Sequence, residues 1–180
     1  MTRPHAIVLV GPPGSGAPEV ARVLAQRWDL PLHDTDALVE ARTGRSAADV
    51  LVQDGETQLR LIEREVALDA LRGRAGVVAL GSGTVDDEQI RAELAAWTGG
   101  GAGGGAPVVL LDLAATTAAR RAGLHAGSTA LVGTRARWRA LFDARHPFYV
   151  EVATVVIDVD DLDDDGAADA VSAVLAAAES

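Results

Sequence analysis

Five short apolar stretches recur along the chain, and each is separated from the next by a longer segment with the spacing of an amphipathic helix. Short runs that are apolar at nearly every position are typical of strands buried on both faces of a sheet. We expect these strands at residues 7–10, 30–32, 77–80, 108–111 and 152–157. The alternation of strands and helices predicts an α/β fold of three layers (α/β/α), in which a five-stranded parallel sheet lies between helices.

Two segments of biased composition interrupt this pattern. Residues 98–106 contain six glycines in nine positions, and we interpret them as a flexible connection. Residues 158–165 contain six aspartates in eight positions just before the last expected helix. A solvated loop that caps that helix is favoured over a metal site, because the run lacks the spaced glycine and final glutamate of a calcium loop.

Composition narrows the classes of protein that this chain can represent. Its 180 residues, of which 48% are hydrophobic and 23% charged, predict one domain over residues 1–180. The absence of cysteine excludes disulfides and thiolate chemistry. A formal net charge of −10 argues against nucleic acid or an anionic membrane as a partner. The first apolar run is too short for a signal peptide or a membrane span, so we expect a cytoplasmic protein.

The segment after the first expected strand has the glycine frame of a phosphate-binding loop. Such a loop has the form G-x-x-x-x-G-K-[ST], where the lysine neutralises phosphates and the hydroxyl serves Mg²⁺. Here those two positions are Ala17 and Pro18, and the chain has 16 basic residues, all of them arginine. The residues that retain the frame are Gly11, Gly14, Ser15 and Gly16. The loop is therefore degenerate, with its scaffold present and its central charge missing.

Three further segments carry candidate chemistry, and each also has a plain structural interpretation. Asp34 and Asp36 follow the second expected strand, where carboxylates serve Mg²⁺ and proton transfer or simply cap a helix. Arg60 and Glu63 lie three positions apart on one helix face, either fixing the guanidinium or forming a surface ion pair. Residues 81–83, Gly-Ser-Gly, offer close backbone approach to a ligand or form an ordinary turn.

Taken in order, these segments resemble shikimate kinase, a family of small P-loop kinases related to nucleoside monophosphate kinases. The resemblance covers nearly the whole chain and is carried by GPPGSG, HDTDALVEARTGRSAADV, DGETQLRLIERE, LGSGTV and RWRALFDARHPFYVEVAT. It implies a transferase that uses ATP and Mg²⁺ to phosphorylate the 3-hydroxyl of shikimate, in the chorismate pathway to aromatic amino acids.

The resemblance also implies a role for particular residues. Asp36 corresponds to the carboxylate that contacts shikimate and helps to deprotonate its hydroxyl, and Asp34 to the residue that supports Mg²⁺ through water. Arg60 and Arg145 match the arginines that bind the shikimate carboxylate. The residues that match the contacts to substrate hydroxyls are Gly81 and Gly83, with Ser82 in place of the middle glycine.

The departures from the family pattern lie on the nucleotide side. Ala17 and Pro18 replace the phosphate-loop lysine and hydroxyl, and Ser128 stands where the family has the lid arginine, in a lid region at about 120–135. Residues 158–165 are acidic where the family commonly has basic residues near the adenine. Arg120, at the base of the lid, is the remaining basic residue that we assign to the nucleotide side.

Three interpretations of function follow. Because loss of one cation that stabilises a transferred phosphoryl group costs about 10³-fold in rate, we favour an impaired or inactive kinase that keeps a shikimate-type acceptor pocket and has an unknown protein partner. In this interpretation binding of ATP and Mg²⁺ is doubtful. The alternative is an active shikimate kinase in which Arg22, Arg120 or Arg121 replaces the lysine. The third is a decaying duplicate that binds neither substrate.

Overall fold

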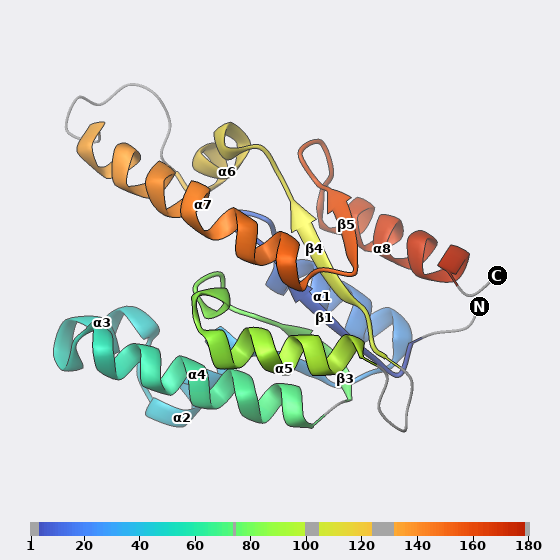
Figure 1. Cartoon of the computed structure of the whole chain (residues 1–180), viewed down its shortest axis with the longest axis horizontal. Coiled ribbons are helices and arrows are strands. Elements are labelled where there is room, and N and C mark those ends of the chain that lie inside the picture. The colour runs from blue at the N-terminus through green and yellow to red at the C-terminus, as the bar shows by residue number, and fades with distance from the viewer. Residues whose placement is uncertain (1–3, 74, 100–104, 124–131, 179–180) are drawn as a thin grey trace.

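Five parallel strands form the central sheet (Figure 1). The computed structural model describes residues 4–73, 75–99, 105–123 and 132–178. The strands are β1 (Ala6–Val10), β2 (Leu32–Asp34), β3 (Gly76–Ala79), β4 (Val108–Asp112) and β5 (Val155–Asp158). The helices are α1 (Ala17–Trp28), α2 (Thr35–Thr43), α3 (Ala47–Asp54), α4 (Glu56–Arg72), α5 (Glu88–Thr98), α6 (Ala115–Arg121), α7 (Val132–Val152) and α8 (Asp164–Ala178), with a 3₁₀ turn, η1, at Thr84–Asp86.

The strand order is β2-β3-β1-β4-β5, and every neighbouring pair is parallel. The chain therefore passes from β1 to one side of the sheet for β2 and β3, and then to the other side for β4 and β5. In open sheets of this kind, ligands bind outside the carboxyl ends of the strands where the order reverses. That position here is the carboxyl end of β1, from which the glycine-rich loop leads into α1.

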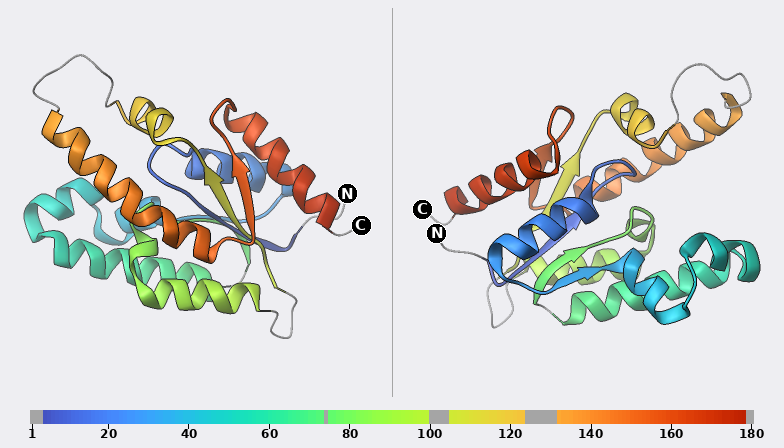
Figure 2. Two further views of the ribbon diagram at one scale, coloured as in Figure 1. Left: turned by 45° about the horizontal axis from the view of Figure 1, so that its top comes forward. Right: turned by 180° about the vertical axis from the view of Figure 1, so that it is seen from behind.

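Helices cover both faces of the sheet, which confirms the expected three layers. On β1, the side chains of Ile7 and Leu9 pack with α1 and α8, and those of Val8 and Val10 pack with α4, α5 and α7. Figure 2 shows α1 and α8 in front of the sheet in the right-hand view, with α7 behind. All five residues of β1 are buried, so this strand is the centre of both apolar layers.

Two strands begin later than the apolar runs predict. Leu30 donates its N–H to Ala25 O (3.0 Å) and so closes the end of α1, and Pro31 has no N–H to give to a ladder. On the other side, α7 continues to Val152, and Ala153 N still donates to Tyr149 O (3.2 Å). A buried residue near a helix end and a strand residue are equally apolar, so the hydrophobic pattern does not separate them.

Outside the sheet, α2, α3 and α4 pack together around a separate small apolar cluster. Its buried members are Val39, Val50, Leu59 and Val66. Among the described residues, no helix combines the length and the apolar composition that crossing a membrane requires. The α2–α4 group matters for the site because it supplies side chains that reach the carboxyl ends of β2 and β3.

Close approach of backbone at Gly76 joins β3 to β2. Gly76 has φ +81° and a β-carbon there would lie 2.3 Å from Pro31 O. Its N–H donates to His5 O (3.0 Å), and the next N–H, of Val77, donates to Pro31 O (2.8 Å). A side chain at this position would push β2 and β3 apart at their amino ends, because the contact is with backbone.

We expect Gly76→Ala to lower the free energy of unfolding by at least about 2 kcal/mol, from left-handed strain and the clash together. Gly44→Ala is the matched control, since Gly44 also has positive φ (68°) but a β-carbon there meets nothing within 4 Å. Urea unfolding of both variants measures the difference. Equal losses of unfolding free energy in the two variants would show that the close contact with Pro31 makes no contribution.

Candidate functional site

The carboxyl ends of β2 and β3 are tied together by the buried side chain of Thr35. Its Oγ1 accepts a hydrogen bond from Gly81 N (2.8 Å), and the residue is 1% exposed. Asp34, the last residue of β2, caps α2 by accepting from Asp36 N (3.1 Å) and Ala37 N (3.4 Å). The helix-cap interpretation of Asp34 is therefore confirmed, and one of its carboxylate oxygens is occupied by the cap.

Asp36 lies in the first turn of α2 with its carboxylate against Gly81. A β-carbon on Gly81 would lie 2.6 Å from Asp36 Oδ1, so glycine is needed there for the approach. Although Asp36 has exposed surface, partial burial of its carboxylate raises the pKa, and the charges of Asp34 and then Glu63 raise it further. The group is therefore easier to protonate than an ordinary aspartate, as suits a carboxylate that accepts a proton.

Two arginines from different helices converge on Gly83. A β-carbon at Gly83 would lie 2.6 Å from Arg60 Nη1 and 3.6 Å from Arg145 Nη2, so the sequence-predicted residues of α4, α7 and the β3 loop meet in space. Arg60 Nη1 donates to Glu63 (2.7 Å), which confirms the pair expected from the sequence. Two guanidinium groups side by side are suited to bidentate binding of a carboxylate.

Two residues that the sequence did not indicate, Tyr149 and Asp86, hold the loop at residues 81–83 and the side chain of Arg145 in place. The Tyr149 hydroxyl donates to the carbonyl oxygen of Ser82, and Tyr149 is 1% exposed. Burial raises the pKa of Tyr149, although the charge of Arg145 lowers it and that of Asp86 adds to the rise. The available signal was its spacing, four residues after Arg145 on the same helix. Asp86, which pairs with Arg145, carried no such signal.

The phosphate-type loop has the folded form expected from its glycines. Gly14 (φ +89°) and Gly16 (φ +79°) adopt left-handed backbone, and Ser15 N donates to Pro12 O (3.0 Å). A β-carbon on Gly11 would lie 2.5 Å from Ser15 Oγ and 2.8 Å from Leu111 O. The loop is thus placed between β1 and α1, with Gly16 as the N-cap of the helix.

The residues at the start of α1 lack the ammonium and hydroxyl groups of the phosphate-loop motif. Ala17, at the lysine position, is a methyl group that is 3% exposed, and Pro18 has neither a hydroxyl nor an N–H. A β-carbon on Gly16 would also lie 3.2 Å from Asp164 Oδ1, so a carboxylate stands against the loop. Burial raises the pKa of Asp164, as do the charges of Glu19 and other neighbouring carboxylates, with Arg121 acting in the opposite direction.

Arg121 of α6 touches this loop, but it binds carbonyl oxygens. Its Nη1 donates to Gly14 O (3.2 Å), and its Nη2 donates to three carbonyls of the segment after β5. Those carbonyls belong to Val159 (2.8 Å), Asp160 (3.1 Å) and Leu162 (3.1 Å). The guanidinium therefore ties the phosphate-type loop to the acidic segment. Arg120, beside it, is exposed.

The acidic segment also caps α8, as expected. Asp163 Oδ1 accepts from Gly166 N (2.8 Å). In the described part of the chain, no group of three or more histidine, aspartate or glutamate side chains is arranged to hold a metal ion. Ser128 and much of the expected lid at 120–135 lie outside the described residues, as does the middle of the glycine-rich segment 98–106.

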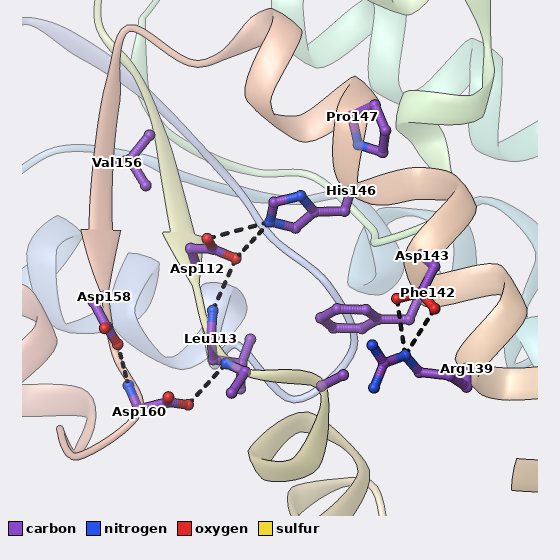
Figure 3. Close-up of a pocket in the computed structure, with 12 residues that line it drawn as sticks. Asp112, Leu113, Arg139, Phe142, Asp143, His146, Pro147, Val156, Asp158 and Asp160 are labelled. Atoms are coloured by element: carbon purple, nitrogen blue, oxygen red, sulfur yellow. Dashed lines mark hydrogen bonds and ion pairs between the residues drawn. The ribbon is translucent and has the colours of Figure 1, made fainter.

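A cavity of about 550 Å³ lies between α7 and the carboxyl ends of β4 and β5 (Figure 3). Its ionisable lining consists of four aspartates, one arginine and one histidine: Asp112, Asp143, Asp158, Asp160, Arg139 and His146. Both basic groups are paired, His146 Nε2 with Asp112 (3.1 Å) and Arg139 Nε with Asp143 (2.8 Å). An excess of carboxylates disfavours a polyanion in this cavity.

Residues from both sides of the site line one small cavity of about 40 Å³. Pro12 and Pro13 of the glycine-rich loop line it together with Arg145 and Tyr149 of α7. Arg145 and Tyr149 therefore lie close to the phosphate-type loop.

Comparison with known proteins agrees with this geometry. A family model described as "Shikimate kinase" matches residues 13–176. The chain is 41% identical over 178 residues to "Shikimate kinase" of Thermobifida fusca strain YX, covering 98% of each protein. A solved structure of "Shikimate kinase from Acinetobacter baumannii in complex with shikimate" superposes with a TM-score of 0.76 at 25% identity, over 94% of this chain and 90% of the other.

The same fold extends to a more distant kinase. A deoxyadenosine kinase from M. mycoides superposes with a TM-score of 0.59 at 14% identity, over 96% of this chain and 99% of the other, which concerns the fold alone. The family match, by contrast, spans most of the chain and includes both sides of the site. The chain therefore belongs to the shikimate kinase family.

Proposed function

We propose that this chain is a shikimate-binding member of the family in which phosphoryl transfer is impaired or lost. One observation carries the proposal, the asymmetry of charge across the site. On the acceptor side, Arg60 and Arg145 converge on Gly83. On the phosphate side, Ala17 takes the place of a cation and a carboxylate, Asp164, lies against the loop.

The acceptor side supports binding of a polyhydroxy carboxylate. The paired guanidinium groups would bind the carboxylate, and the backbone of residues 81–83 would approach the ring hydroxyls. Asp36, whose pKa is raised, would accept the proton of the ligand hydroxyl if phosphoryl transfer takes place. The shikimate kinase from A. baumannii was solved in complex with shikimate, which supports shikimate as the choice of ligand here.

Two features of the phosphate side support this proposal, one through the rate of phosphoryl transfer and one through nucleotide binding. The missing lysine removes a stabiliser of the transferred group that is worth about 10³-fold in rate. Asp164 adds a negative charge near the same loop, where phosphates would be repelled. We accordingly propose that ATP and Mg²⁺ bind poorly and that any cellular role depends on acceptor binding in the cytoplasm. We also infer one domain over residues 1–180, with the lid at 120–135.

A second candidate, an active shikimate kinase with a substitute arginine, has one observation in its favour. Arg121 already contacts the phosphate-type loop, at Gly14 O (3.2 Å). To reach a phosphate, however, its guanidinium would have to leave several carbonyl oxygens. Its planar fork also differs from the point charge of a lysine.

Calorimetry with shikimate and Mg–ATP in separate titrations tests the proposal. We expect heat of binding with shikimate and none with the nucleotide. Arg60→Ala should weaken shikimate binding by about 10- to 100-fold, because a charge-assisted contact is lost. Arg139→Ala removes an exposed arginine paired with Asp143 on α7 and should leave the affinity unchanged. Absence of heat with shikimate, or equal affinity of the Arg60 variant and the parent, would contradict the acceptor pocket.

A coupled kinase assay at millimolar ATP and shikimate should show turnover at background for the natural chain. Restoring both groups in the double variant Ala17→Lys/Pro18→Ser should raise the rate at least about 100-fold. The matched control, Ala17→Met/Pro18→Ser, restores bulk and hydroxyl without the ammonium and should stay near background. If the natural chain already turns over well, the second candidate gains, and Arg121→Ala then shows whether that arginine is responsible.

The raised pKa of Asp36 predicts a pH-dependent gain in stability for Asp36→Asn. A raised folded-state pKa contributes stability below the unfolded pKa, near 3.8, that is lost as the pH rises through the folded value. The asparagine variant escapes that loss, so its Tm should exceed that of the parent at pH 7 by up to about 3 °C. The difference should shrink as the pH falls towards 4. Glu40→Gln, on the same helix, controls for loss of one negative charge; a difference independent of pH would refute the assignment.

A further inference from the structure

The guanidinium of Arg145 is already bound to a carboxylate of the chain itself. Arg145 Nε lies 3.0 and 2.9 Å from the two carboxylate oxygens of Asp86, and Nη2 lies 2.7 Å from Oδ2. The edge of the guanidinium formed by Nε and Nη2 is thus paired with the carboxylate of Asp86. The Arg145 side chain is 14% exposed and that of Asp86 is 43% exposed, so solvent reaches the pair mainly from the side of the carboxylate.

The nitrogen that holds Asp86 is also the one that faces the acceptor loop. Arg145 Nη2 is the atom 3.6 Å from the position of a β-carbon on Gly83, next to Arg60 Nη1. A carboxylate placed between the two guanidinium groups would therefore meet an Arg145 whose charge Asp86 already balances, so the two carboxylates compete for one cation. Asp86 also lines a cavity of about 240 Å³ together with Gly83 and Arg60, so there is room for its side chain to turn away.

The two arginines differ in how firmly their internal partners are placed. Arg60 and Glu63 lie one turn apart on α4, and Glu63 is only 18% exposed. Asp86 and Arg145 lie 59 positions apart, on η1 and α7, and Asp86 has more exposed surface. Separation of Arg60 from Glu63 would leave the shielded carboxylate of Glu63 unpaired. The more exposed carboxylate of Asp86 can be hydrated instead while an acceptor carboxylate pairs with Arg145.

We infer that Asp86 is a specificity-determining residue, an internal counterion that competes with an acceptor carboxylate for the charge of Arg145. The inference rests on the proposed function, since it concerns the same acceptor pocket. This competition lowers the affinity for acceptors that carry a carboxylate. An acceptor whose carboxyl group is esterified has no charge to exchange for Asp86 and leaves the pair intact. Asp86 therefore reduces the difference in binding affinity between an acceptor with a free carboxylate and its uncharged ester.

Calorimetry with shikimate and with methyl shikimate tests this on Asp86→Asn. The variant should bind shikimate about three- to tenfold more tightly than the parent, the range expected when a partly exposed competing ion pair is removed, and should bind the ester unchanged. Asp143→Asn is the control, because Asp143 also pairs with an arginine of α7 but lies away from Gly83. Unchanged or weaker binding of shikimate by Asp86→Asn, or an equal gain for the ester, overturns the inference. Asp86→Thr, with thermal unfolding of each variant, guards against a folding defect at η1.

A second readout separates this inference from the proposed function. Modification by an arginine-selective dicarbonyl reagent, mapped by peptide mass, should be several-fold faster at Arg145 in Asp86→Asn than in the parent and unchanged at Arg139. If Arg145 is modified at the same rate in Asp86→Asn and in the parent, then Asp86 does not protect Arg145, whether or not shikimate binds. If Arg145 becomes more reactive but no form of the protein binds shikimate, the proposed function fails, while the occupation of Arg145 by Asp86 is supported.

Discussion

The hydrogen bond from Gly81 N to the buried hydroxyl of Thr35 fixes the relation between two strand ends, and the acceptor side depends on it. Parallel strands deliver their carboxyl ends to one edge, but the sheet alone does not decide which loop residues touch. Thr35 brings the β3 loop against α2, so Asp36 meets Gly81. The same loop then presents Gly83 to arginines from α4 and α7.

The two sides of the site differ in the charges that surround them. On one side, each arginine has a nearby carboxylate, so the cationic pocket is locally balanced before any ligand arrives. On the other side, Asp164 and its acidic neighbours face a loop with no ammonium. The guanidinium nearest the phosphate-type loop, that of Arg121, is bound to carbonyl oxygens, whereas Arg60 and Arg145 both approach Gly83. The two sides of the site therefore differ in charge although one sheet positions them both.

The sequence predicts the architecture well because its signals are local. Apolar runs locate all five strands, and the spacing of glycines locates the loop after β1. The errors at the start of β2 and β5 arise where helix ends are as apolar as strands. Convergence of Arg60 and Arg145 followed from resemblance to a family, since nothing in the spacing of two residues so far apart in the chain predicts contact. The partnership of Asp86 with Arg145 was not predictable from either source, because a single exposed aspartate after a turn has many possible neighbours.

Arg121 has a consequence for how this loop could change during evolution. In an ordinary nucleotide-binding protein, bound phosphate helps to organise the glycine-rich loop. Here one guanidinium joins the carbonyl of Gly14 to three carbonyls beyond β5, so the protein's own atoms brace the loop. A loop that is braced by hydrogen bonds of the protein itself depends less on bound phosphate for its shape. Substitutions such as those at Ala17 and Pro18 could then accumulate under selection for a folded protein alone, independently of selection for catalysis.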